Sequence, residues 1–311
     1  MTSAISRRDL LAGAAVLGLS GDAGAVQKQP SRDSFIFCLN TATIRGQNLP
    51  ITDEVDIAAK AGYQAIEPWI EKLDRYTQGG GNLRDLARRI SDGGLRVESA
   101  IGFSEWLVED EGRRRKGVED AKRAMAIVRQ IGGRRLAAPP AGATNQADLS
   151  LARAAERYRA LLEAGAQIGV VPQLELWGMS RCLSRLGECA QVAIDSGHPQ
   201  ACILTDVYHL YKGGSGFTGL KLLNGAALQV MHMNDYPATP ARATITDAHR
   251  VYPGDGIAPL PALLRDLRRR GFGGVLSLEV FNREYWKQDA LTVARTGLEK
   301  MRAVVRASLK E

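Results

Sequence analysis

Four short apolar runs in the second half of the chain each carry one side chain that can bind a metal ion. These side chains are Glu175 in "PQLEL", Asp206 in "ILTDV", His232 in "LQVMHMND" and Glu279 in "VLSLEV". A single acidic residue in such a run could also be explained by a buried ion pair with Arg, since burying an unpaired charge is costly. Three carboxylates brought together, with no Lys or Arg on the same runs, would repel one another, and a divalent cation is the simplest compensation. The three oxygens and one nitrogen suit manganese, magnesium or cobalt better than a thiolate-preferring ion, and zinc also fits.

The elements that must position these residues follow one another in a regular order of strand, then helix. Short apolar runs occupy residues 35–40, 65–69, 97–102, 136–140, 172–176, 203–207, 228–235 and 275–280. Between them lie amphipathic stretches with apolar residues three and four positions apart, and several of these end in Gly, which is typical of a helix C-cap. Eight such units without a low-complexity linker predict an α/β fold, a single (β/α)8 TIM barrel formed by residues 26–311. In this fold the C-terminal ends of the strands meet on one face, so the four side chains are expected to converge there.

The pattern of these residues resembles that of a known family. Asp206 and His209 form D-x-x-H, His232 begins H-x-N-D, and Glu279 precedes the last helical stretch. With Glu175, this pattern is similar over most of the chain to the xylose-isomerase-like TIM-barrel superfamily, and within it to the ketose 3-epimerase and inosose-dehydratase-like sugar isomerases. The resemblance implies one divalent metal ion, usually manganese, held by the four residues at the strand ends. It also implies that Glu175 and Glu279 move protons on opposite faces of a bound sugar and that His209 contacts the substrate.

The chemistry that this arrangement supports is proton transfer next to a carbonyl. A metal ion bound to a carbonyl and an adjacent hydroxyl stabilises an enediolate, so one carboxylate can remove the proton and a second can return it. We therefore predict an isomerase or epimerase that acts on a small sugar or keto-sugar. Glu67, Trp69 and Trp177 stand at or beside the ends of strand-like runs and are predicted to line the sugar pocket. Arg242, or Arg250 in the same segment, could neutralise the charge that develops on the substrate.

Two other functions would use the same residues. A lyase or hydrolase acting on keto-sugars or 3-keto-glycosides would begin with the same proton abstraction and then expel a leaving group. A non-catalytic sugar-binding barrel is the third alternative, and the complete set of four ligands argues against it. The related apurinic endonucleases need histidines from the early strands for a three-zinc site, whereas all four His residues here lie in the second half of the chain. The net charge of +7 is scattered over helical patterns, so no nucleic-acid partner is expected.

The first 25 residues predict an export signal. Arg7 and Arg8 precede a short apolar run, and "AGA" at residues 23–25 offers small residues to a peptidase. The segment resembles a twin-arginine signal, so we expect a periplasmic protein that meets free sugars rather than phosphorylated ones. No other stretch is long and apolar enough to span a membrane, and the four cysteines, which lack C-x-x-C spacing, are expected to be buried free thiols. Related barrels often pair, so a homo-oligomer is a further expectation.

Overall fold

The computed structural model of this protein describes residues 35–146 and 148–310. The export signal predicted for residues 1–25 lies outside the described residues and stays a prediction. Among the described helices, none is long and apolar enough to cross a membrane. The four cysteines are buried and free, as the sequence predicts.

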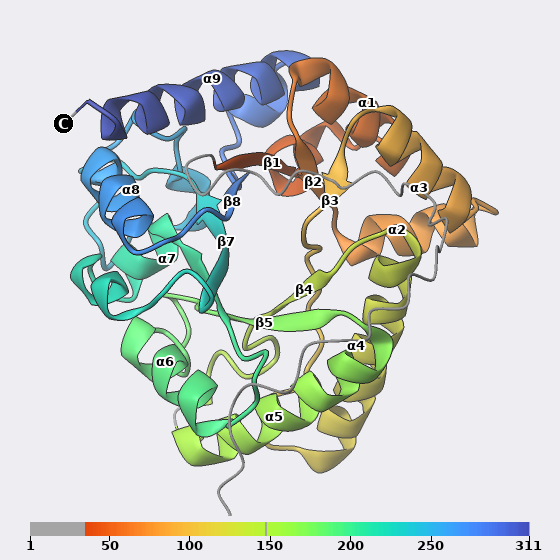
Figure 1. Cartoon of the computed structure of the whole chain (residues 1–311), viewed down its shortest axis with the longest axis vertical. Coiled ribbons are helices and arrows are strands. Elements are labelled where there is room, and N and C mark those ends of the chain that lie inside the picture. The colour runs from red at the N-terminus through yellow and green to blue at the C-terminus, as the bar shows by residue number, and fades with distance from the viewer. Residues whose placement is uncertain (1–34, 147, 311) are drawn as a thin grey trace, which may run out of the picture. The chain divides into compact units, whose positions relative to one another are not determined.

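Eight parallel strands of the described chain form one curled sheet (Figure 1). They are β1 (Ile36–Asn40), β2 (Ala65–Glu67), β3 (Arg96–Val97), β4 (Arg135–Ala138), β5 (Val171–Glu175), β6 (Ile203–Asp206), β7 (Leu228–Met233) and β8 (Val275–Leu278). The order in the sheet is β3-β2-β1-β8-β7-β6-β5-β4, which leaves β3 and β4 as the outer strands. The segment after β3 joins them, because the backbone nitrogen of Ala100 donates to the oxygen of Arg135 (3.1 Å) and that of Ala137 donates to Ala100 (2.9 Å). The eight strands therefore form the (β/α)8 barrel that the alternation predicts.

The helices lie outside the strands (Figure 1). They are α1 (Ile51–Ala61), α2 (Ile70–Gln78), α3 (Leu83–Asp92), α4 (Glu111–Gln130), α5 (Leu151–Ile168), α6 (Leu186–Asp195), α7 (Val207–Lys212), α8 (Leu260–Arg269) and α9 (Ala290–Ser308). Local sequence sets their ends. The side chain of Ser150 caps the start of α5 by accepting from the nitrogen of Arg153, and Gly169 ends it with a φ of 82°, a left-handed conformation that favours glycine.

Side chains on each strand alternate between the barrel interior and the helix layer. On β7, Val230 and His232 point inward, while Met231 packs against the helices. On β8, Val275 belongs to the small interior cluster of apolar residues, and Ser277, two positions further on, faces the same way. Apolar residues therefore fill the barrel interior near the start of each strand. Polar residues take the inward-facing positions where each strand ends.

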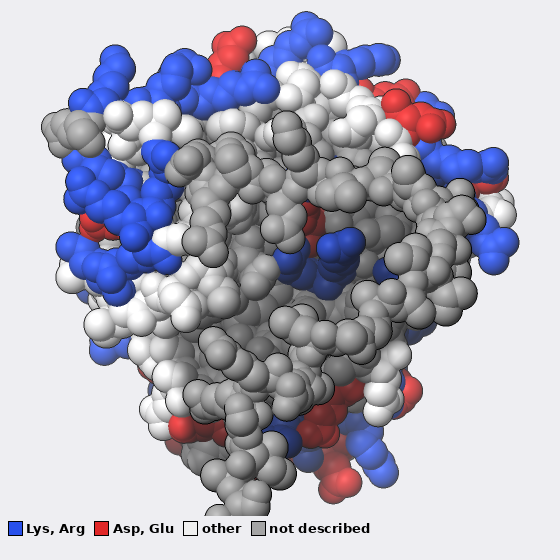
Figure 2. All heavy atoms as spheres, viewed as in Figure 1, with Lys and Arg blue, Asp and Glu red and all other residues white. Residues whose placement is uncertain are grey.

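Charged side chains lie mainly on the helices. Lys and Arg gather over α8 and α9 and recur around the edge of the molecule with Asp and Glu among them (Figure 2). Arg113 and Lys116 on α4 and Arg269 at the end of α8 are exposed. These basic residues are thus part of the solvated surface of the helices.

Candidate active site

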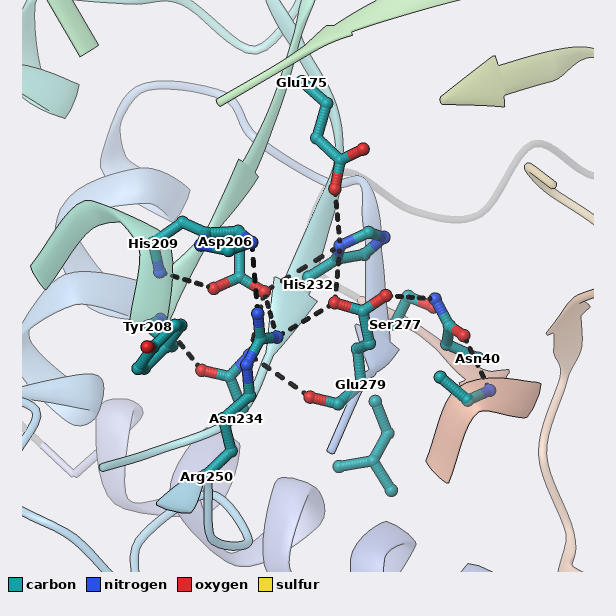
Figure 3. Close-up of polar contacts among 12 residues, drawn as sticks. Asn40, Glu175, Asp206, Tyr208, His209, His232, Asn234, Arg250, Ser277 and Glu279 are labelled. Atoms are coloured by element: carbon teal, nitrogen blue, oxygen red, sulfur yellow. Dashed lines mark hydrogen bonds and ion pairs between the residues drawn. The ribbon is translucent and has the colours of Figure 1, made fainter. Parts of the chain in front are cut away.

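The four side chains predicted to bind a metal ion lie together where β5 to β8 end (Figure 3). Nδ1 of His232 is 3.2 Å from Oε2 of Glu279, 3.7 Å from Oε1 of Glu175 and 3.9 Å from Oδ2 of Asp206. All four residues are buried, with no more than 4% of any of them exposed. One ligand atom each from Asp206, His232 and Glu279 lie within 4.8 Å of one another. The fold therefore brings three carboxylates and one imidazole from four separate strands into a single buried cluster.

The cluster has the chemistry of a divalent-cation site. Within the described part of the chain, Nδ1 of His232 and Oε2 of Glu175 are buried and have no hydrogen-bond partner of acceptable geometry. Buried polar atoms without a hydrogen-bond partner are rare in folded proteins. Here they indicate a ligand, such as a metal ion, that these side chains bind together. Carboxylate oxygens and an imidazole nitrogen are donors that manganese, cobalt and zinc accept. The residues present therefore fit a metal ion held by the four side chains.

Glu67 lies behind His232 and not in the cavity beside the cluster. Its side chain is fully buried, and its Oε2 contacts Nε2 of His232 at 3.1 Å. The same oxygen accepts from Oγ of Ser277 at 2.6 Å and from Nδ2 of Asn40 at 3.1 Å. Asn40 also donates to Oε1 of Glu279 at 3.0 Å, so one amide links the supporting carboxylate to a candidate ligand. The prediction that Glu67 contacts the sugar is corrected: its carboxylate orients the imidazole so that Nδ1 faces the cluster.

Asp206 is the N-cap residue of α7, and this cap fixes the positions of both Asp206 and His209. Oδ1 of Asp206 accepts from the backbone nitrogen of His209 at 2.7 Å, which is the usual N-cap interaction. Oδ2 accepts from Nδ2 of Asn234 at 2.9 Å, and Asn234 also donates to the backbone oxygen of Glu279 at 3.2 Å. Asn234, the third residue of the H-x-N-D pattern, therefore braces two strand ends, a role that the sequence reasoning did not assign to it.

Arg250, and not Arg242, supplies the cationic side chain of the site. Arg250 is only 1% exposed, and its Nη1 donates to Oδ2 of Asp206 at 2.8 Å and to Oε2 of Glu279 at 2.9 Å (Figure 3). Its Nη2 lies 3.1 Å from Nε2 of His209. Arg242 is exposed and does not line the cavity beside the cluster, so the structure does not bring this predicted contact to the site.

The loop after β7 explains this difference. Asp235 and Val251 form an isolated antiparallel bridge, with backbone hydrogen bonds of 2.9 Å in both directions. This bridge returns the chain to the end of β7 and places Arg250 directly beside the cluster. Arg242 lies in the part of the loop that extends away from the bridge, where its guanidinium packs near Gly214.

Burial and charge shift the pKa values of the two candidate catalytic glutamates in opposite directions. Desolvation raises the pKa of Glu175 to about 8, although the charge of His232 opposes the shift. Desolvation acts on Glu279 in the same direction, but His232 and Arg250 outweigh it and lower the pKa of that carboxyl. Without a bound metal ion, the surroundings therefore favour the protonated form of Glu175 and the ionised form of Glu279.

A cavity of about 190 Å³ opens beside the cluster. Its polar lining consists of Glu175, His209, Asp247, Arg250 and Glu279, and its aromatic lining of Trp69, Phe103, Trp177 and Phe281. Of the residues predicted to contact a sugar, His209, Trp69 and Trp177 lie here. Phe103 and Phe281 were not predicted, although each stands just beyond a strand-like run, "VESAIG" and "VLSLEV". The cavity is smaller than the roughly 300–1,000 Å³ of pockets that bind drug-sized molecules, so it suits a ligand of about one sugar ring.

The chain is a TIM barrel with a candidate metal site at its strand ends, and comparison with known proteins identifies its family. The model of the Xylose isomerase-like TIM barrel family matches residues 55–304, so the chain belongs to that family. Among curated proteins, it is similar to the inosose isomerase of Bacillus velezensis, with 28% identity over 273 residues that cover 86% of this chain and 96% of that protein. It is also similar to the fructoselysine 3-epimerase of Escherichia coli O157:H7, with 24% identity over 83% of this chain and 95% of that protein.

The barrel is also similar to solved structures. A crystal structure described as the IOLI protein with a binding zinc atom superimposes with a TM-score of 0.82, at 22% identity, over 89% of this chain and 100% of that one. At this level of identity the likeness shows the fold. The relatives named as isomerases and epimerases are consistent with an enzyme that acts on a small sugar.

Proposed function

We propose that this protein is a divalent-metal-dependent isomerase or epimerase that moves a proton next to the carbonyl of a small keto-sugar or cyclitol ketone. The observation that carries the proposal is the position of two buried glutamates, Glu175 and Glu279, around a donor set that fits a metal ion, in surroundings that shift their pKa values in opposite directions. Pairs of carboxyl groups whose environments separate their pKa values are typical of acid–base catalysis. The relative named inosose isomerase supports a polyhydroxylated ketone as the substrate.

The metal ion would polarise the substrate carbonyl and make the adjacent C–H group more acidic. Manganese is the favoured ion, and zinc is the alternative because the similar IOLI structure binds a zinc atom. Glu279 would accept the proton from carbon as a carboxylate. Glu175, in its acid form, would return a proton to the other face of the same carbon, which inverts the configuration there.

His209 and Arg250 would hold the substrate during this exchange. Burial lowers the pKa of His209 to about 4, so its imidazole is neutral at physiological pH. Its Nε2 faces the guanidinium of Arg250, which makes Nδ1 the nitrogen that carries the proton. That Nδ1 is buried and has no protein partner among the described residues, and it can donate to a substrate hydroxyl or carbonyl. Arg250 would stabilise negative charge on the substrate after proton removal.

The test is proton exchange measured by NMR. The protein is loaded with manganese, incubated in D₂O with inosose, a free ketose or a 3-keto-glycoside, and stripped of metal before spectra are recorded. We expect deuterium at the carbon next to the carbonyl, and the product shows whether the reaction is epimerisation or, as in the alternative lyase, release of a leaving group. No exchange with any of these substrates by metal-loaded protein would contradict the proposal.

The variant Glu279→Gln tests the role of Glu279 as the proton acceptor in this exchange. It keeps the size of the side chain but removes the proton acceptor, so we expect the exchange rate to fall by roughly 10²- to 10⁴-fold at a manganese content matched to that of the wild type, while the circular dichroism spectrum is unchanged. Glu284→Gln, an exposed residue just beyond the same strand, is the control. Normal exchange in Glu279→Gln would rule out the two-glutamate mechanism.

A further inference from the structure

A second, larger cavity adjoins the sugar-sized one. It has a volume of about 670 Å³ and lies between α2, α4 and the segment that follows β3. Ile101 and Phe103 line both cavities, so the two cavities are neighbours at these side chains. The inner cavity, at about 190 Å³, has room for one ring only.

Phe103 separates the two cavities and is itself open to solvent. It is 46% exposed, and Met179 at the edge of the inner cavity is equally exposed. The ring of Phe103 is packed between two indoles, 5.0 Å from that of Trp69 and 5.9 Å from that of Trp177, measured between centroids. These contacts hold the ring in place while leaving apolar surface uncovered at the boundary. Phe103 therefore presents uncovered aromatic surface where the two cavities meet.

The charges of the outer cavity indicate what kind of group it binds. Its lining contains four acidic and four basic side chains, so their formal charges cancel. Three acid–base pairs are in direct contact: Glu71 with Arg75, Asp74 with Arg123, and Glu105 with Arg113. A phosphate or a carboxylate would have to compete with these carboxylates for the arginines. A neutral group rich in hydroxyls can accept and donate hydrogen bonds along the lining without breaking the pairs.

We propose that the preferred substrate is a neutral glycoside of two rings, with the keto-sugar in the inner cavity, the bond to the second sugar passing Phe103, and the second sugar in the outer cavity. This inference rests on the proposed function and names its substrate class. The C–H face of the second ring would lie against the phenyl ring of Phe103, and its hydroxyls would face the neutral polar lining between α2 and α4. Free monosaccharides would reach the metal site but would leave the outer cavity to water.

The test compares two ligands that place the same keto-sugar in the inner cavity and differ in whether a second ring is attached. Isothermal titration calorimetry would use Glu279→Gln protein, which cannot turn over substrate, at a manganese concentration shown to saturate this variant. It would measure binding of methyl 3-keto-glucoside and of the 3-keto form of a glucose disaccharide. We expect the disaccharide to bind at least tenfold more tightly. Phe103→Ala in the same background should reduce this ratio to within about twofold of unity, whereas Ile194→Ala, which removes an exposed apolar side chain on α6, should leave the ratio unchanged.

Each outcome decides one of the two proposals. Equal affinity for the two ligands, or a ratio that survives Phe103→Ala, would overturn the two-ring inference while leaving the proposed reaction intact. The proposed reaction is tested separately by deuterium exchange into methyl 3-keto-glucoside with wild-type protein. If neither ligand binds and no exchange occurs, the proposed function fails, and the inference about its substrate fails with it.

Discussion

At the scale of single residues, the site depends on how the two nitrogens of one imidazole are used. Nδ1 of His232 faces three carboxylates, and Nε2 faces the buried carboxylate of Glu67, which Ser277 and Asn40 hold in place. A carboxylate behind a metal-binding histidine fixes the ring orientation and increases the basicity of the nitrogen that binds the metal. Glu67 is therefore a positioning residue that acts through His232.

Glu67→Gln is expected to weaken metal binding while leaving the fold intact. The amide keeps the size of the side chain but removes its negative charge, and changes of this kind typically cost roughly 10- to 100-fold in metal affinity. Competition with a metal-sensitive dye would give the dissociation constant for manganese, and the absorption spectrum of the cobalt form would report the changed coordination. Glu71→Gln, on the exposed side of α2, is the control. Unchanged affinity and spectrum in Glu67→Gln would show that Glu67 does not support the metal site.

The two arginines of the loop after β7 give a second prediction at this scale. Arg250→Lys keeps the positive charge but cannot contact Asp206, Glu279 and His209 together, since Lys lacks the planar fork of donors. We expect kcat/KM for the exchange reaction to fall by roughly 100-fold. Arg242→Lys, which changes an exposed side chain of the same loop, should have no effect. Equal rates in both variants would remove Arg250 from the mechanism.

At the scale of elements, two glycines allow α7 to pack closely against the loop that follows β5. A Cβ atom built at Gly213, just after α7, would lie 1.9 Å from the backbone oxygen of Ser184, and one at Gly178 would lie 2.3 Å from the backbone oxygen of His209. The backbones approach so closely that no side chain fits between them. This contact fixes the helix that carries His209, and it gives a physical reason for a glycine at position 213, just beyond the D-x-x-H pattern.

Gly213→Ala is therefore expected to destabilise the protein by about 1–3 kcal/mol, the range found when extra atoms are forced into packed regions. The φ of −75° at this position is ordinary, so the cost arises from the steric overlap and not from the backbone conformation. Gly187→Ala in α6 is the matched control, since its Cβ would meet no atom within 4 Å. That variant should gain up to about 1 kcal/mol from helix propensity. Urea denaturation measures both, and equal stability of the two variants would contradict a steric role for Gly213.

At the scale of the whole molecule, a buried carboxylate outside the candidate metal cluster makes stability depend on pH. Glu54 on α1 is fully buried, and Nζ of Lys72 lies 3.0 Å from its Oε1. Desolvation raises the pKa of Glu54 from 4.5 to about 7, although Lys72 opposes the shift. The folded state therefore binds this proton more tightly than the unfolded state does. Stability is highest below pH 4.5 as far as this group is concerned, and it falls as pH rises from 4.5 to 7.

Glu54→Gln should remove this dependence. At pH 8 the variant is expected to be more stable than the wild type by on the order of 3 kcal/mol, the free energy that corresponds to the raised pKa. At pH 4.5 the two proteins should differ little, because the glutamate is then largely protonated in the folded state. The free energy of unfolding in urea at both pH values measures the effect, with the exposed Glu156→Gln as the control. A constant difference between the two pH values would mean that Glu54 does not titrate as described.

The sequence by itself determined the barrel, its strand ends and the candidate metal ligands. Helical and strand periodicity are local properties, and Glu175, Asp206, His232 and Glu279 could be identified because each stands at the end of a strand whose direction the parallel fold prescribes. The export signal of residues 1–25 rests on sequence alone.

Only the tertiary structure decided the roles of Glu67 and Arg250. Glu67 ends a strand just as Glu175 does, yet the pairing of β2 with β1 places it beside Asn40 and behind His232, outside the lining of the cavity. Arg250 is eighteen residues from His232, and a single bridge between Asp235 and Val251 brings it back to the cluster in place of Arg242. Strand register and loop path arise from contacts between distant segments, so the spacing of residues along the chain does not contain them.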